Sequence, residues 1–339
     1  MKKLIFRCGQ MLCLTAFWLM LLQHSLVLKY AKEGLLIWSS HVLPLLLPFI
    51  ILSKFWIRYQ IPELFFARAK KAFPAHRDTA VSLPIFLLGL CSGFPIGAIF
   101  ISHYYQNKTL SKQQAETLLP LASFLSPMFV LGYIHSQIQI QHSQWLIYLL
   151  TLYLPIIICY FFTQLSEKLQ KEKLKKMHLH ILSQKTLPDK ILSKRNSAKL
   201  NKSLPNIHTL NKPAPSLSLT EEIWIPSIKI ICVIGIYMMI FSILSGMLLR
   251  FALFQTPILT FLLANLEITT GIHLLATNKL YSLKAVYILT ATAASFGGIC
   301  TMAQVQTVIS DTDLSLKKYV QIKLLTAGIT FLLYSSLLN

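Results

Sequence analysis

Apolar runs close to the length of a membrane-spanning helix occupy most of this chain. A helix needs about 20 predominantly apolar residues to cross the hydrocarbon core of a bilayer. Of the 339 residues, 54% are hydrophobic and 13% are charged, against about 25% charged in a typical soluble domain. The apolar runs cover residues 11–28, 42–57, 81–105, 118–134, 145–164, 223–249, 256–277, 282–305 and 319–337. The sequence therefore predicts an all-α polytopic membrane protein with seven to nine hydrophobic segments.

Two of these runs are interrupted where a lipid-facing helix should be continuous. Residues 89–97 contain Gly93, Pro95 and Gly97, and residues 265–271 carry a carboxylate and two threonines. Hydrocarbon offers the backbone no hydrogen-bond partner, so broken helices survive there only when they are buried in protein or line a cavity. Paired interruptions in two halves of a chain indicate a transporter with its substrate site at the breaks.

The net charge of +20 is concentrated in a segment outside the apolar runs. Residues 165–222 hold many lysines among serines, asparagines and prolines, a composition typical of disorder. We expect residues 165–182 to continue the preceding helix and the remainder to form a cytoplasmic loop that contacts anionic lipid. No folded nucleic-acid reader is recognisable in this segment, so nucleic acid is not an expected partner.

The distribution of basic residues predicts the topology. Lys2, Lys3 and Arg7 place the N-terminus in the cytoplasm, with residues 11–28 as a retained first helix. Basic side chains in residues 58–77 and 165–222 place both of these loops on the same side. Three apolar segments lie between the two loops, so one of them must enter and leave on one side. The interrupted segment 81–105 is the predicted re-entrant hairpin; the alternative is an ordinary kinked helix.

The second half of the chain repeats this arrangement, which predicts an inverted repeat. Adding about 175 to each number maps 81–105 onto 256–280 and 118–134 onto 293–309. A rival register adds 204 and makes 282–305 the second hairpin instead. Charge counting does not separate the two registers. The predicted units are residues 1–57 (N-terminal helices), 58–164 (first gate-like repeat), 165–222 (basic loop) and 223–339 (second gate-like repeat).

Glu267 is the sharpest candidate site residue, because it is the only carboxylate in its apolar segment. An ionised carboxylate inside a membrane costs about 2.5 kcal/mol or more by insertion scales. We interpret it as a coupling site for a proton or cation, or as a hydrogen-bond acceptor for substrate. The alternative is a structural salt bridge to Lys229.

The other candidate residues flank the interruptions of both halves. Free N–H groups at the starts of half-helices carry partial positive charge and suit an anionic substrate. The alternative for each small residue is helix–helix packing. The predicted substrate-binding set is Ser92, Gly93, Pro95, Gly97, Ser123, Ser126, Pro127, Asn265, Glu267, Thr269, Thr270, Gly271, Ser295, Gly297, Gly298 and Gln304.

The motifs of membrane enzymes and metal proteins are absent from the sequence. There is no HExxH, no G-x-S-x-G, no P-loop and no pair of intramembrane aspartates. The six cysteines are scattered without a CxxC or Cys/His cluster. We therefore expect neither an enzyme nor a cofactor or metal, and any coupling would use an ion or solute gradient.

Several blocks in order along residues 40–330 resemble the bacterial sporulation integral membrane proteins of the stage V type. The blocks are Gly93-Phe94-Pro95-Ile96-Gly97-Ala98, residues 110–119, Ser126-Pro127-Met128-Phe129, Leu266-Glu267-Ile268-Thr269-Thr270-Gly271, residues 295–304 and residues 311–319. Proteins of that family contain the nucleoside-recognition, or gate, domain and are similar to concentrative nucleoside transporters. The chain departs from the family pattern at Ser123, Phe124 and Met302, where polar groups are lost or altered.

The resemblance implies transport of a small anionic solute, dipicolinic acid, across the outer forespore membrane of an endospore-forming bacterium. The alternatives are a nucleoside-type solute transporter and a non-transporting scaffold for assembly of the spore envelope (cortex). We expect an integral protein of the cell membrane or outer forespore membrane. Its expected partners are the solute, membrane lipids, and either a second copy or other sporulation membrane proteins.

Overall fold

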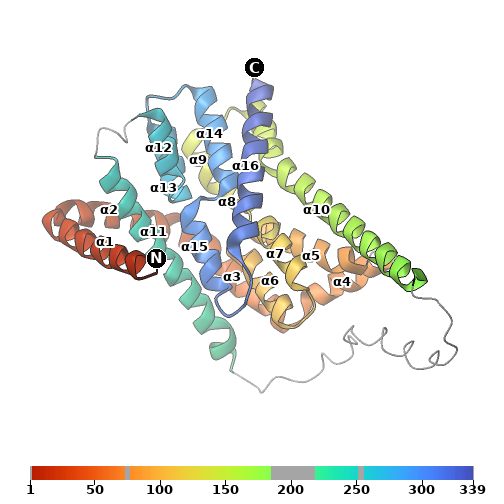
Figure 1. Cartoon of the computed structure of the whole chain (residues 1–339). Coiled ribbons are helices and arrows are strands. Elements are labelled where there is room, and N and C mark those ends of the chain that lie inside the picture. The colour runs from red at the N-terminus through yellow and green to blue at the C-terminus, as the bar shows by residue number, and fades with distance from the viewer. Residues whose placement is uncertain (1, 73–76, 185–217, 251–255, 339) are drawn as a thin grey trace.

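The computed structural model describes residues 2–72, 77–184, 218–250 and 256–338, and within these ranges it contains helices and no strands. The chain is an all-α integral membrane protein, as the composition predicts (Figure 1). The helices are α1 (Lys2–Leu22), α2 (His24–Ile37), α3 (Leu43–Arg58), α4 (Ile61–Ala72), α5 (Arg77–Ser92), α6 (Ile96–Gln106), α7 (Lys112–Ala122), α8 (Pro127–Phe129), α9 (His135–Ile138), α10 (His142–Gln184), α11 (Ile225–Leu248), α12 (Pro257–Ala264), α13 (Ile268–Thr277), α14 (Leu283–Phe296), α15 (Gly298–Val308) and α16 (Leu316–Leu338).

Six helices in the described ranges are long and apolar enough to cross a membrane. They cover His24–Arg58, Lys112–Ile138, Gln144–Leu174, Thr220–Leu248, Leu283–Val308 and Leu316–Leu337. The first differs from the prediction of separate segments at 11–28 and 42–57. Helices α2 and α3 join through a π-helical turn at Trp38–Val42 into one span, and α1 is a separate helix. Polar residues such as Lys29 and Glu33 divided this span in the hydropathy pattern, although a long helix can carry polar side chains on one face.

The first interrupted run is a hairpin whose two ends lie at the same end of the bundle, which confirms the prediction from charge. The Arg58 end of the bundle is the end where α3 finishes, and α4 follows it directly. Helix α5 starts after α4 and packs against it. Helix α6 returns to α4, where the Tyr104 hydroxyl donates a hydrogen bond to Glu63 at 3.0 Å. The turn between α5 and α6 therefore lies inside the bundle (Figure 1).

The second hairpin is formed by α12 and α13 and inserts from the opposite end of the bundle. The Tyr281 hydroxyl, just after α13, donates to the carbonyl of Pro257 at the start of α12. His273 on α13 hydrogen-bonds Gln137 on α9 at 2.8 Å, at the end of the crossing that starts at Lys112. The register near 175 is confirmed, and the 204 register is wrong because α14 and α15 together cross the bundle.

The N-caps of two corresponding helices define the residue offset between the two halves more closely. Ser111 caps α7 and Ser282 caps α14, each accepting a hydrogen bond from a backbone N–H of the first turn. These two N-caps are 171 positions apart. Both capped helices are then interrupted, the first at residues 123–126 and the second at Gly297. At Gly297 the backbone has a φ of 88°, a left-handed conformation that favours glycine.

Helix α10 extends to Gln184, well past the apolar run. This agrees with the prediction that residues 165–182 continue the preceding helix. Figure 1 shows α10 projecting beyond the neighbouring helices. The predicted disorder of the rest of the basic segment falls mainly on residues 185–217, which lie outside the described residues.

We predict that Gly97→Ala destabilises the protein, whereas Gly132→Ala does not. A Cβ added to Gly97 would overlap the carbonyl of Ala122, but one added to Gly132 meets no atom within 4 Å. Overpacking of this kind costs about 1–3 kcal/mol. The measurement is the melting temperature of the purified protein in detergent. Equal melting temperatures for the two variants would contradict the close packing of α6 against α7.

Candidate functional site

The turn of each hairpin is hydrogen-bonded to the break in the helix that follows it. In the first half, the Phe94 N–H donates to the carbonyl of Phe124 at 2.9 Å. In the second half, the N–H groups of Ile299 and Cys300 donate to the carbonyls of Asn265 and Leu266, at 2.9 and 2.8 Å. These contacts supply partners for backbone groups that the broken helices leave open, as a membrane interior requires.

Both turns and both broken helices contribute to one small central cavity. Gly93 and Phe94 line it from the first hairpin, and Leu125, Ser126 and Phe129 line it from the first break. Residues 267–269 line it from the second hairpin, and Thr301 and Gln304 from the half-helix α15. The cavity measures about 20 Å³, which is room for about one water molecule.

Two larger cavities lie on either side of the central cavity. The Arg58-end cavity measures about 480 Å³, and its lining includes Lys54 on α3, Pro95 and His103 on the first hairpin, Lys229 on α11 and Gln304 on α15. The opposite-end cavity, of about 500 Å³, is lined by residues 30–41, 133–137, 242–249 and 270–277.

The three cavities follow one another along the same two antiparallel helices. Along the first span, residues 30–41 line the opposite-end cavity, Val42 and Leu46 the central cavity, and residues 54–57 the Arg58-end cavity. Along α11 the order of residue numbers is reversed, because Arg58 pairs with Glu222 and Gly34 packs against Ser242. The central cavity is therefore a constriction between two wide vestibules.

Glu267 caps the start of α13 and faces the central cavity. Its carboxylate accepts hydrogen bonds from the N–H groups of Thr269 and Thr270, at 3.0 and 2.7 Å, and from both threonine hydroxyls. The residue is 2% exposed. The partial positive charge at the start of a helix stabilises a carboxylate in this position. The alternative was a salt bridge to Lys229, but no ion pair among the described residues joins the two. Lys229 is exposed and lines the Arg58-end cavity.

The structure distributes the predicted site residues over the three cavities and the packing around them. Gly93, Ser126, Glu267, Thr269 and Gln304 line the central cavity. Thr270 and Gly271 line the opposite-end cavity, and Pro95 and Gln304 the Arg58-end cavity. None of these three cavities is lined by the remaining described residues of the set, namely Ser92, Gly97, Ser123, Pro127, Asn265, Ser295, Gly297 and Gly298.

The residues outside the cavities build the breaks rather than face a solute. Gly97 lies against the Ala122 backbone, and the Asn265 carbonyl receives the N–H of Ile299. Gly298 takes a φ of 85°. Ser123 and Ser295 are fully buried, and within the described structure their hydroxyls have no hydrogen-bond partner.

Lys323 is a buried cation that the sequence reasoning missed. It is 1% exposed on α16, and its ammonium lies 4.6 Å from the centre of the Phe124 ring. Among the described ion pairs none involves Lys323. The signal was present, because Lys323 is the only charged residue in the apolar run 319–337. A polar residue of this kind inside a membrane is by default a functional candidate.

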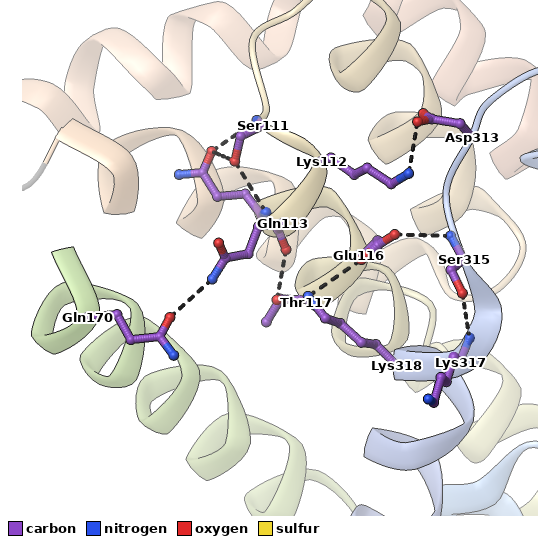
Figure 2. Close-up of polar contacts among 11 residues, drawn as sticks. Ser111, Lys112, Gln113, Glu116, Thr117, Gln170, Asp313, Ser315, Lys317 and Lys318 are labelled. Atoms are coloured by element: carbon purple, nitrogen blue, oxygen red, sulfur yellow. Dashed lines mark hydrogen bonds and ion pairs between the residues drawn. The ribbon is translucent and has the colours of Figure 1, made fainter. Parts of the chain in front are cut away.

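A polar network at the Arg58 end joins the two halves of the chain. Figure 2 shows Lys112 at the start of α7 pointing to Asp313, with an ion pair of 2.8 Å. Glu116 accepts from the Ser315 N–H at 3.2 Å and pairs with Lys318 at 3.4 Å. Hydrogen bonds from Lys112 and Tyr105 hold the pKa of Asp313 below its usual range. Asp313 thus keeps its charge at neutral pH, and the network ties the start of α16 to α7.

Over the described residues, no group of three or more His, Cys, Asp or Glu side chains is arranged to hold a metal ion. The site therefore consists of backbone groups, hydroxyls, one amide and two buried charges. Such groups can bind and orient a solute through hydrogen bonds and electrostatics.

The chain is similar to the sporulation integral membrane protein YlbJ of Bacillus subtilis (strain 168). The identity is 25% over 316 residues, which are 87% of this chain and 73% of that protein. No family model matches the chain, and no solved structure matches it. The similarity agrees with the motif resemblance at the level of sporulation integral membrane proteins, while the nucleoside-recognition domain stays a prediction.

We predict that Glu267→Ala lowers the stability of the protein by about 1–2 kcal/mol, because it removes an N-cap that satisfies two backbone N–H groups. The matched control is Glu172→Ala, at an exposed position on α10, which should change stability by less than about 0.5 kcal/mol. Melting temperatures in detergent compare the two. A Glu267→Ala protein as stable as the wild type would show that the cap is not a net stabilising interaction.

Proposed function

We propose that this chain is a membrane transporter that passes a small anionic solute between its two vestibules. The observation that carries the proposal is the order of the cavities, with a constriction built from both hairpin turns between two spaces of about 480 and 500 Å³. A central space for about one water molecule is too small for an organic solute, so transport requires one hairpin at a time to move.

The backbone hydrogen bonds between the hairpin turns and the helix breaks are few enough to exchange during transport. One backbone hydrogen bond fastens the first hairpin to its break, and two fasten the second. Each contributes a net of about 0.5–1.5 kcal/mol. A solute that binds better to the open arrangement can shift an equilibrium of this size. The two hairpins insert from opposite ends, so each controls access from its own side.

Dipicolinate is the proposed substrate, and the outer forespore membrane the proposed site of action. The support is the similarity to a sporulation integral membrane protein, the motif resemblance and the strongly basic composition. Lys70, Lys71 and Arg68 on α4 lie toward the Arg58 end, and so does the lysine-rich C-terminal part of α10. By the positive-inside rule we assign this end to the cytoplasm. The N-terminus shares that side when α1 is counted as a further crossing before the span that begins at His24.

A scaffold function is the alternative, and it predicts a dry centre with Glu267 paired to Lys229. The small residues around Ala122 are packed in this way. The capped state of Glu267 and the two vestibules favour transport instead.

We predict that Gln304→Leu abolishes dipicolinate accumulation without loss of stability. Gln304 lines the central and Arg58-end cavities, and within the described structure its Oε1 atom is buried without a partner. Replacement by leucine removes an unsatisfied polar atom, which costs the fold little. The variant is expressed as the sole homologue in a deletion strain of a spore former, and spore dipicolinate is measured. We expect at least a tenfold loss.

The control is Gln306→Leu, an exposed position on the same helix, which should leave dipicolinate at the wild-type level. Both variants are quantified in membranes, so that altered abundance is not taken for altered transport. Normal dipicolinate in Gln304→Leu spores, with both proteins present, would overturn the transport path. If spores that express the wild-type chain also lack dipicolinate, dipicolinate is not the substrate.

We also predict one-sided labelling of the two vestibules. In a variant with all six cysteines replaced by serine, Thr307→Cys lines the Arg58-end cavity and Thr277→Cys the opposite-end cavity. A membrane-impermeant thiol reagent added to right-side-out vesicles should label Thr277→Cys only, and inside-out vesicles should label Thr307→Cys only. The reverse pattern would invert the assigned orientation.

A further inference from the structure

The surroundings of Lys323 do not neutralise its charge. The ammonium lies 4.6 Å from the Phe124 ring centre and 5.7 Å from the Tyr319 ring centre. Two aromatic faces attract a cation, but less strongly than a carboxylate does. A cation buried in this way is costly unless it gains an anionic partner.

An unpaired hydroxyl is carried by the residue next to the ring that contacts this lysine. Ser123, directly before Phe124, is 0% exposed, and no described group hydrogen-bonds its Oγ atom. Buried donors without partners are rare in native proteins and call for an explanation such as an unfilled site. An ammonium and a hydroxyl donor together suit a carboxylate.

Phe124 connects Lys323 to the first break, part of which lines the central cavity. Its ring lies under the ammonium, and its carbonyl receives the Phe94 N–H of the first hairpin. The next two residues, Leu125 and Ser126, line the central cavity. When the first hairpin moves, the hydrogen bond that holds Phe124 is lost, and the break is free to rearrange. Lys323 would then be exposed to whatever occupies the centre.

We propose that Lys323 binds a carboxylate group of the transported solute, with the hydroxyl of Ser123 as a second donor. This inference rests on the proposed transport function and names the substrate class of the same path, an organic carboxylate. Glu267 lies on the second hairpin, with its carboxylate held by the start of α13. Lys323 is thus the cation that selects for a negatively charged solute at a centre that otherwise carries a carboxylate.

The test is the melting temperature of the purified full chain in detergent, with and without ligand. The probes are dipicolinate and its uncharged isostere, pyridine-2,6-dicarboxamide. A ligand that binds the folded state raises the melting temperature, by several degrees at saturating concentration. We expect the wild type to respond to dipicolinate and not to the diamide.

Lys323→Met should abolish the response to dipicolinate, and Lys317→Met should keep it. Lys317 lies on the same helix but is exposed, so the control makes the same chemical change outside the bundle. Without ligand, we expect Lys323→Met to melt at or above the wild-type temperature, because a costly buried charge is removed. Ser123→Ala, which deletes an unpaired hydroxyl, is the second variant and should weaken the response severalfold.

A dipicolinate response in Lys323→Met equal to that of the wild type would overturn the proposal. So would a wild type that responds to neither probe, or equally to both. If Lys323→Met does not fold, an unweakened response in Ser123→Ala overturns it. Spore dipicolinate distinguishes failure of this proposal from failure of the transport function. Normal dipicolinate in Lys323→Met spores would show that Lys323 does not bind the solute, while transport by this chain would still be supported.

Discussion

The hydrogen bonds between hairpin turns and helix breaks are the interactions on which the rest of the structure depends. A membrane interior leaves an open backbone group no partner other than protein or enclosed water. Each half of the chain solves this by setting a turn against a break, with Phe94 donating to Phe124 and with Ile299 and Cys300 donating to Asn265 and Leu266. Turn and break are therefore stable only together. Gly97 and Gly271 allow the hairpin helices to approach their neighbours closely, because a side chain at either position would overlap a neighbouring carbonyl.

The two halves share a topology, but at the centre they differ in the direction of their hydrogen bonds and in the sign of their buried charge. In the first half the hairpin donates a hydrogen bond to the break, whereas in the second half the break donates to the hairpin. The buried charges differ as well, with Lys323 next to the first break and Glu267 in the second hairpin. The two halves therefore place a cation and a carboxylate at different points around the centre, which two identical halves would not do.

Much of the fold was predictable from charge and hydropathy, and less of the site was. The re-entrant segment 81–105 followed from the basic loops on either side, because an odd number of crossings was excluded. The register of the second half was not decided by sequence, since the Gly297–Gly298 break looks as much like a hairpin turn as like a broken span. The choice between the two registers depends on contacts between residues that are distant in sequence, such as the hydrogen bond from Tyr281 to Pro257.

Side-chain roles at the centre were harder to predict for a similar reason. Glutamate is not among the residues preferred at an N-cap. The sequence therefore suggested a coupling site or a solute acceptor for Glu267, with a salt bridge as the alternative, and not a cap. Lys323 lies alone in an apolar run, and a window average of hydropathy hides a single charge. Its approach to Phe124 requires α16 to pack against α7, which no local pattern shows.

The closed centre also limits the mechanism by which a solute could cross. Wide vestibules on both sides leave only a thin barrier, formed by two turns and two breaks. A channel would need a continuous opening through this barrier, and a space for one water molecule does not provide it. The hairpins enter from opposite ends and each closes on its own break. The proposed transport function therefore requires one hairpin to release while the other stays fastened, so that the barrier opens from either side in turn. This requirement is what distinguishes the proposed transporter from a pore.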